Sequence, residues 1–179
     1  LQYFVADQKF MAIFSMLFGA STALICDQLA AKQLNVSVIF GRRIVLLLLI
    51  GLIHAYLIWH GDILVTYALC SLLPFWFRHA RWQVAVAVGL LLLILGSLNS
   101  WYSYDAINAY PAHIQQHLAQ IYWSPSATDL AAEIAAFQGS WLEQFSYRAA
   151  LAYHFQTDTF LAWGVWRVSG LMLIGLGLY

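Results

Sequence analysis

The sequence predicts an all-α protein, a multi-pass transmembrane helical bundle with short amphipathic helices outside the membrane. Hydrophobic residues make up 63% of the 179 residues and charged residues only 9%, whereas soluble domains carry about 25% charge. The mean hydropathy is +0.73. The eight Trp and ten Tyr add rings of the kind that gather at the headgroup level of a bilayer. We therefore expect residues 1–179 to form a single membrane domain whose main partner is the lipid bilayer.

The formal charge is zero, from eight basic and eight acidic residues, so no basic surface exists to attract nucleic acid. Cys26 and Cys70 lie in apolar runs, where a thiol behaves as a small hydrophobe, and we expect no disulfide. The sequence opens at Leu1 without an initiator Met and stops at Tyr179 inside an apolar run. We therefore expect it to be an excerpt of a longer protein.

About five segments are apolar enough to span a hydrocarbon core, which takes roughly 20 residues of helix. These segments are 10–26, 44–59, 63–77, 84–98 and 160–179. The third is short, about 23 Å at 1.5 Å per residue, so the bilayer must thin around it or Arg78 must snorkel. Pro74 is expected to kink the third helix near its end.

The cations predict the orientation, because Lys and Arg accumulate in short cytoplasmic loops. Five of them lie in the loop before the second segment and in the loop after the third. These are Lys32, Arg42, Arg43, Arg78 and Arg81. Residues 27–43 and 78–83 are therefore predicted to be cytoplasmic, and residues 60–62 and 99–157 external. Lys9, near the outer end of the first segment, is the one exception.

The external stretch 99–157 carries two helix-start patterns of the capping-box type, at residues 126–129 and 140–143, with Gly139 as a stop between them. Apolar residues recur at helical spacing after the second pattern. Trp141, Phe145, Ala149 and Ala152 are predicted to form one face, and Glu143, Gln144 and Tyr147 to point elsewhere. We expect short amphipathic helices over the outer mouth of the bundle, serving as interfacial anchors or, alternatively, as a lid.

His54 is the leading candidate for chemistry, because an ionisable side chain inside an apolar segment is rare and commonly functional. As a general base it needs a pKa near ambient pH, which partial burial and a nearby carboxylate supply. Asp62 is the candidate carboxylate. The alternative is a structural, neutral imidazole that is satisfied by a backbone carbonyl or a Tyr hydroxyl of a neighbouring helix.

Asp62 has a second explanation, because it directly precedes Ile63 and is placed to cap the third helix. The two roles are compatible, since a carboxylate has lone pairs for both. His60 is expected at the water interface. A zinc site built from His54, His60 and Asp62 is a minor alternative, because their spacing matches no closed zinc motif, and no metal is expected.

Arg167 is the other ionisable residue inside an apolar segment, where an unpaired guanidinium is costly. It lies about 11 Å beyond Phe160 at 1.5 Å per residue, in the predicted outer half of the membrane. It is therefore expected to reach the same cavity as His54 and Asp62, and either to pair with Asp62 or to hold an anionic substrate group. The alternative is that it snorkels past Trp163 to the interface.

Three stretches resemble the YeiB-like membrane proteins, the family catalogued as domain of unknown function 418. They are KFMAIFSMLFGAS, RRIVLLLLIGLIHAYLIWHGDILVTYAL and WRVSGLMLIGLGLY. The resemblance rests most on Gly51-Leu-Ile-His54, on Trp59 to Leu64, and on Tyr67-Ala68. Ser21 and Ser71 depart from the small residues that the family usually has there. The resemblance implies a further helix upstream and several downstream.

The family is distantly similar to transmembrane acyltransferases, which pass an acyl group from a cytoplasmic donor such as acetyl-CoA to an acceptor at the outer face. The resemblance thus implies His54 as base, Asp62 as its orienter and Arg167 as an anion or acceptor contact. We expect His60 and Tyr67 as further substrate contacts. It also implies an envelope glycan or lipid as acceptor, no bound cofactor, and the bacterial inner membrane as location. A proton-coupled transporter or permease, and a structural membrane protein, remain the alternatives.

Overall fold

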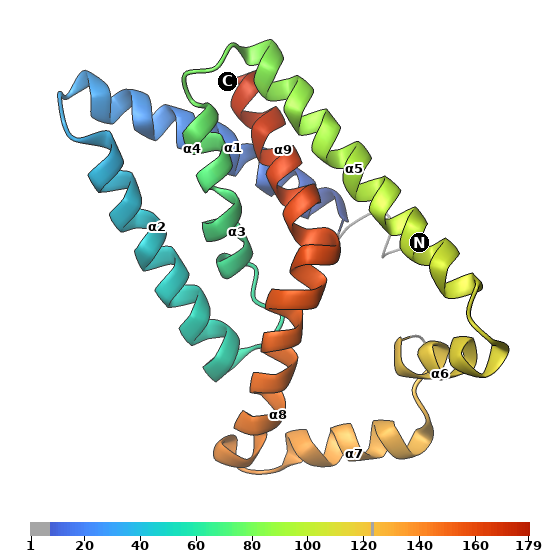
Figure 1. Ribbon diagram of the computed structural model, residues 1–179. Coiled ribbons are helices and arrows are strands. Elements are labelled where there is room, and N and C mark those ends of the chain that lie inside the picture. The colour runs from blue at the N-terminus through green and yellow to red at the C-terminus, as the bar shows by residue number, and fades with distance from the viewer. Residues whose placement is uncertain (1–7, 123) are drawn as a thin grey trace.

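The computed structural model describes residues 8–122 and 124–179, and in this part of the chain every regular element is a helix (Figure 1). The α-helices are α1 (Gln8–Ala31), α2 (Val36–Ile53), α3 (Leu64–Cys70), α4 (Leu72–Phe77), α5 (Trp82–Asn108), α6 (Ala112–Tyr122), α7 (Ala127–Gln138), α8 (Trp141–His154) and α9 (Val165–Leu178). Two π-helical segments, η2 (His54–Ile58) and η3 (Phe155–Gly164), continue α2 and α8. The predicted all-α class is confirmed.

Four of the helices are long and apolar enough to cross a membrane. They are Lys9–Ala31, Val36–Ile58, Trp82–Asn108 and Trp141–Leu178. Large side chains on their outer faces are exposed, as lipid-facing positions require, whereas the core gathers around α9. The chain is therefore membrane-embedded.

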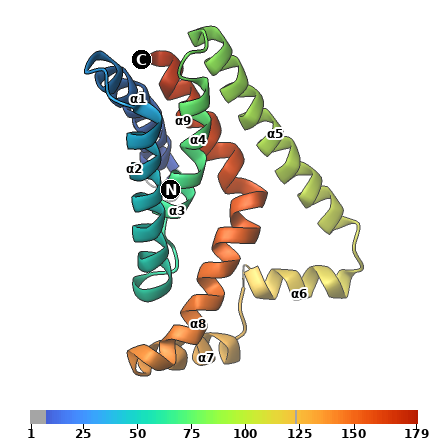
Figure 2. The ribbon, with the colours of Figure 1, turned by 60° about the vertical axis from the view of Figure 1, so that its left-hand side comes forward.

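Helix α9 is the centre of the bundle, with α1 and α5 on either side of it and α3 and α4 against a further face (Figures 1 and 2). Small residues permit this packing. Gly19 of α1 lies against the carbonyl of Met172, and Gly175 of α9 lies against the carbonyl of Met16, so that a Cβ at either glycine would overlap backbone atoms. Close backbone approach at glycines is the usual way in which helices associate in lipid.

The third predicted span is a pair of short helices, α3 and α4, that meet at Ser71. Pro74 explains the break, because it has no N–H and its ring collides with the carbonyl four residues earlier. The α-helix is thus interrupted three residues before Pro74, the position at which a kink was predicted. Together the two helices cover about 21 Å, less than the roughly 30 Å of a hydrocarbon core, and α3 is packed between α2 and α9.

Several helices extend beyond the predicted spans. Helix α5 continues to Asn108, past residue 98, and α8, η3 and α9 form one apolar helix of 38 residues that begins at Trp141. The sequence between Trp141 and Phe160 contains no Gly or Pro that would stop a helix, and α5 ends only three residues before Pro111. The two ends of the predicted external stretch are therefore extensions of spanning helices.

The middle of that stretch does form separate helices, α6 and α7, which lie across the end of the bundle (Figures 1 and 2). Both predicted helix starts are confirmed. Ser126 accepts a hydrogen bond from the backbone N–H of Asp129 at 3.1 Å, and the N–H of Ser140 donates to the Glu143 carboxylate at 2.7 Å. The two loops that were predicted to be cytoplasmic lie together at the opposite end of the bundle (Figure 1).

Candidate functional site

The candidate site lies where the chain leaves α2 and enters α3, at the end of the bundle opposite the two basic loops. We call residues 54–65 the outer corner. His54 is the first residue of η2, where the helix widens: the N–H of Trp59 donates to the His54 carbonyl, five residues back, at 2.8 Å. Short π-helical stretches of this kind occur frequently at functional sites. The chain then turns through His60 and Gly61 to Asp62.

His54 and Asp62 are in contact, with 2.9 Å between Nδ1 of the imidazole and Oδ1 of the carboxylate. The second carboxylate oxygen accepts the backbone N–H of Val65, also at 2.9 Å, in the first turn of α3. Asp62 is completely buried, whereas 32% of the His54 side chain is exposed. Asp62 therefore caps the helix and holds the imidazole at once, which are the two roles that its position in the sequence allowed.

The contact also determines the tautomer of a neutral imidazole. An ionised carboxylate can only accept hydrogen bonds, so Nδ1 carries the hydrogen and Nε2 keeps a free lone pair. Within the described part of the chain no side chain or backbone group hydrogen-bonds to Nε2 of His54. In this arrangement the carboxylate of Asp62 orients the imidazole through Nδ1 and leaves Nε2 free to accept a proton, as a general base requires.

Two glycines bring the corner together. A Cβ on Gly51, one turn before His54, would lie 2.8 Å from the backbone nitrogen of Val65, so only a residue without a side chain lets α2 approach α3 this closely. Gly61 likewise leaves space for the indole of Trp59, because a Cβ at position 61 would lie only 2.6 Å from that ring. That indole stands edge-on to the His54 ring, with 6.4 Å between the ring centroids.

Arg148 of α8 completes the corner, a role that no local sequence pattern predicts. Its guanidinium, 4% exposed, donates to the carbonyl of Leu57 at 2.6 Å and to the side chain of Gln144 at 2.9 Å. The indole of Trp141 donates to the same carbonyl at 3.0 Å. Carbonyls at a helix end lack intrahelical donors, and α8 supplies them here. Gln144, which was predicted to point away from the bundle, therefore belongs to the inner face of α8.

Two of the predicted substrate contacts are not joined to the His54–Asp62 pair. The buried hydroxyl of Tyr67 lies 2.7 Å from Oγ of Ser15 on α1, and Ser15 donates in turn to the Met11 carbonyl. His60 packs beside Trp59 with 6.4 Å between ring centroids, and it makes no side-chain hydrogen bond to any described residue. Its place on the turn nevertheless keeps it near the corner, whereas Tyr67 is bound to α1.

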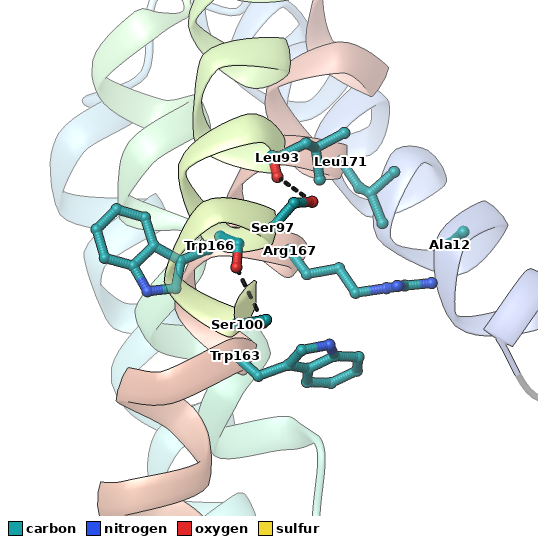
Figure 3. A pocket seen from close by; sticks show the side chains of 9 residues that line it. Ala12, Leu93, Ser97, Ser100, Trp163, Trp166, Arg167 and Leu171 are labelled. Atoms are coloured by element: carbon teal, nitrogen blue, oxygen red, sulfur yellow. Dashed lines mark hydrogen bonds between the residues drawn. The ribbon is translucent and has the colours of Figure 1, made fainter. Parts of the chain in front are cut away.

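Arg167 lies in a different pocket, so the single cavity expected from the sequence is not formed. The pocket has a volume of about 330 Å³ and is lined by α1, α5, η3 and α9 (Figure 3). Neither His54 nor Asp62 lines it. The reason is helical rotation: Val168 packs with Tyr67 of α3, and the preceding residue is turned about 100° away from it. Arg167 instead stacks over Trp163, with 5.2 Å from the guanidinium carbon to the ring centroid.

Among residues 8–122 and 124–179, no three His, Cys, Asp or Glu side chains gather closely enough to hold a metal ion. What the outer corner offers chemically is one positioned imidazole with a buried carboxylate behind it. Such a pair can accept a proton at Nε2 and release it again.

Comparison with known proteins finds only proteins described as uncharacterised. The chain is 33% identical to the protein YxaH of Bacillus subtilis over 73% of its residues. It is 34% identical over 54% of its residues to a 39.9 kDa protein encoded beside an amylase in Bacillus acidopullulyticus, and 27% identical over 97% to YeiB of Escherichia coli.

No family model and no solved structure matches the chain. The matched regions amount to 34% of YxaH, 28% of the 39.9 kDa protein and 42% of YeiB, so the chain spans less than half the length of each relative. These similarities support a relationship between this membrane-embedded chain and the YeiB-like proteins.

Proposed function

We propose that the His54–Asp62 pair is the general base of an acyltransferase that acylates a hydroxyl group at the outer face of a membrane. One observation carries the proposal: the imidazole is fixed through Nδ1 by a buried carboxylate at 2.9 Å, and its other nitrogen is unbonded on a side chain that is partly exposed. This geometry is the one that general-base catalysis requires.

In this reaction Nε2 of His54 takes the proton of the acceptor hydroxyl while the oxygen attacks the carbonyl carbon of a thioester. The carbon–sulfur bond breaks as the tetrahedral intermediate collapses, and the imidazolium returns its proton to the departing thiolate. The products are an ester and a free thiol. Asp62 keeps the ring in place and stabilises the imidazolium that forms between the two steps.

The proposed donor is acetyl-CoA or another acyl-CoA from the cytoplasm, and the proposed acceptor is an envelope glycan or lipid. The proposed location is the inner membrane of a bacterium, with the turn at residues 60–62 on the outer side. Support comes from the resemblance to the YeiB-like family, from its distant similarity to acyltransferases, and from the basic loops at the opposite end of the bundle. His60, on the same turn, is placed to contact the acceptor.

The test is label transfer by the full-length protein in nanodiscs, supplied with labelled acetyl-CoA and a cell-envelope extract. We expect transfer by the wild type, at least a hundredfold less with His54→Gln, and a smaller loss with Asp62→Asn, which retains a cap acceptor. His154→Gln is the matched control, because His154 also binds a carboxylate, that of Asp158 at 2.6 Å, but at an exposed position. It should transfer label as the wild type does.

Absence of transfer by the wild type would contradict the proposal, and so would full activity of a correctly folded His54→Gln variant. Because a misfolded variant also loses activity, the unfolding midpoint of each variant is to be measured beside its turnover. Retained stability with lost turnover assigns His54 to the chemistry.

A second candidate, a proton-coupled transporter, is favoured by the irregular helices. Transporters often place substrate and ion sites at breaks in spanning helices, and here η2, η3 and the break at Ser71 all interrupt α-helical geometry. In that case the His54–Asp62 pair would bind the coupling proton. Proteoliposomes would then show a proton flux that Asp62→Asn abolishes, with no label transfer in the acyl-CoA assay.

A further inference from the structure

The pocket around Arg167 contains a positive charge for which the described residues provide no counter-ion. The Nε atom of Arg167 is buried and has no hydrogen-bond partner there, and the guanidinium forms no ion pair with a described carboxylate. Its one recorded interaction is with the Trp163 ring at 5.2 Å. The side chain as a whole is half-buried, and because a guanidinium stays protonated in proteins, its buried part keeps the charge.

The two described carboxylates that form ion pairs, those of Asp62 and Asp158, have partners other than Arg167. Asp62 uses both oxygens, for His54 and for the N–H of Val65, and Asp158 is paired with His154. In an apolar environment an unpaired cation is costly, and such a group marks a site that receives a counter-ion. A negatively charged ligand would supply the counter-ion that the described residues do not provide.

The walls of the pocket indicate what else the ligand carries. Leu93 and Leu171 give it an apolar side, and Ala12 of α1 lies opposite the end of the Arg167 side chain (Figure 3). On α5, Ser97 and Ser100 donate to backbone carbonyls one turn back, at 2.8 and 3.0 Å, which leaves their oxygens as acceptors only. One cation among mostly apolar walls suits an anionic group attached to an aliphatic chain.

The size and location of the pocket agree with such a ligand. A volume of about 330 Å³ falls in the range of small-molecule sites. The pocket lies over α9, in the groove between α1 and α5, two helices that pack on α9 rather than on each other. Beyond the pocket, α5 exposes further apolar side chains, including Leu90 and Ile94, to the surrounding lipid.

We infer that this pocket binds an anionic amphiphile, whose carboxylate or phosphate is held by the guanidinium of Arg167 while its aliphatic chain lies along α1 and α5. A planar guanidinium presents parallel N–H donors that match either anion. The inference is independent of the acyltransferase proposal, because the pocket includes neither His54 nor Asp62.

The test is photolabelling of the full-length protein in phosphatidylcholine nanodiscs. Three probes carry the same diazirine-bearing chain: a free fatty acid, phosphatidylglycerol and phosphatidylcholine. We expect the anionic probes to label the peptides around Ser97 and Arg167 about tenfold more than the zwitterionic probe, as one charge-assisted contact allows. Labelling by the fatty acid alone would assign a carboxylate ligand, and labelling by phosphatidylglycerol alone a phosphate ligand.

Arg167→Gln should lower the labelling to the phosphatidylcholine level, and Arg167→Lys should retain part of it. The control variant is Arg81→Gln, which removes the same charge from an exposed position at the start of α5. It should label as the wild type does.

Unlabelled fatty acid or phosphatidylglycerol should also displace its probe from the wild-type protein, a readout that needs no variant. Equal labelling by all three probes, or labelling that Arg167→Gln leaves unchanged, would overturn the inference. The guanidinium of Arg167 would then not bind the anionic group of the probe.

Discussion

The outer corner and the Arg167 pocket both contain charged side chains among apolar helices. They differ in the number of hydrogen bonds that these side chains make within the described part of the chain. In the corner, the carboxylate of Asp62 and the guanidinium of Arg148 each make two hydrogen bonds within the chain. In the pocket, the guanidinium of Arg167 makes none to a described residue. The buried charges of the corner are thus partnered, whereas the half-buried guanidinium of Arg167 keeps a buried Nε without a described partner, which is costly.

This difference separates charged groups that stabilise the folded structure from a charged group that we propose binds a ligand. A fully partnered group stabilises the fold, so that its removal leaves other buried atoms without partners. An unpartnered group opposes folding, and its retention needs another reason, such as binding. Substitutions at the two regions should therefore affect stability very differently.

The largest effect is expected for Asp62→Ala. This change leaves the N–H of Val65 unsatisfied in a buried position and frees the ring of His54, and we expect about 2–4 kcal/mol less stability. An SDS titration of the full-length protein in mixed micelles measures the difference.

Asp62→Asn is the matched variant, because an amide oxygen still accepts from Val65 while the charge is lost. It should cost about half as much. Equal losses for the two variants would show that the charge, and not the helix cap, is what the corner depends on.

The next largest effect is expected for Arg148→Met. Methionine keeps much of the apolar stem but removes the donor to the Leu57 carbonyl, and we expect a loss of about 1–2 kcal/mol. Amide hydrogen exchange should become faster in η2 and α8, where the two segments are in contact. Arg81→Met, at an exposed position, serves as control, and an equally small effect of both changes would remove Arg148 from the account of the corner.

The sequence predicted the corner better than the pocket, and the reason is distance along the chain. His54 and Asp62 are eight residues apart, on either side of a short turn, so a local pattern of a buried histidine and a capping aspartate contains the whole contact. The N-cap at Ser126 and the capping box at Ser140 were predictable for the same reason. Local hydrogen bonds need only three or four residues to be specified.

The pocket and the Arg148 contact depend on packing between distant segments, which one sequence does not specify. The contact of Arg148 with Leu57 joins residues 91 positions apart. Whether Arg167 faced Asp62 or α1 was decided by the rotation of α9, and a shift of one residue on a helix turns a side chain by about 100°. In an apolar helix with little amphipathic contrast, composition does not fix that rotation.

A smaller effect on stability is expected for His54→Gln. The glutamine side chain is placed to donate to Asp62, whose cap on α3 stays intact, and the site is already partly exposed, so we expect a loss of about 0.5–1 kcal/mol. The same titration measures it. A loss as large as that of Asp62→Ala would identify His54 as a structural imidazole and weaken its role as a base.

The smallest effect is expected for Arg167→Met, because the charge it removes has no partner among the described residues. In lipid-free detergent we expect a change within about 0.5 kcal/mol of zero, or a gain, since methionine fits the apolar walls without a desolvation cost. Added fatty acid or phosphatidylglycerol should then raise the unfolding midpoint of the wild type and not that of the variant, because a ligand stabilises only the state that binds it. A loss of 2 kcal/mol or more in detergent would mean that Arg167 is as fully partnered as Arg148, and the contrast between the two regions would no longer hold.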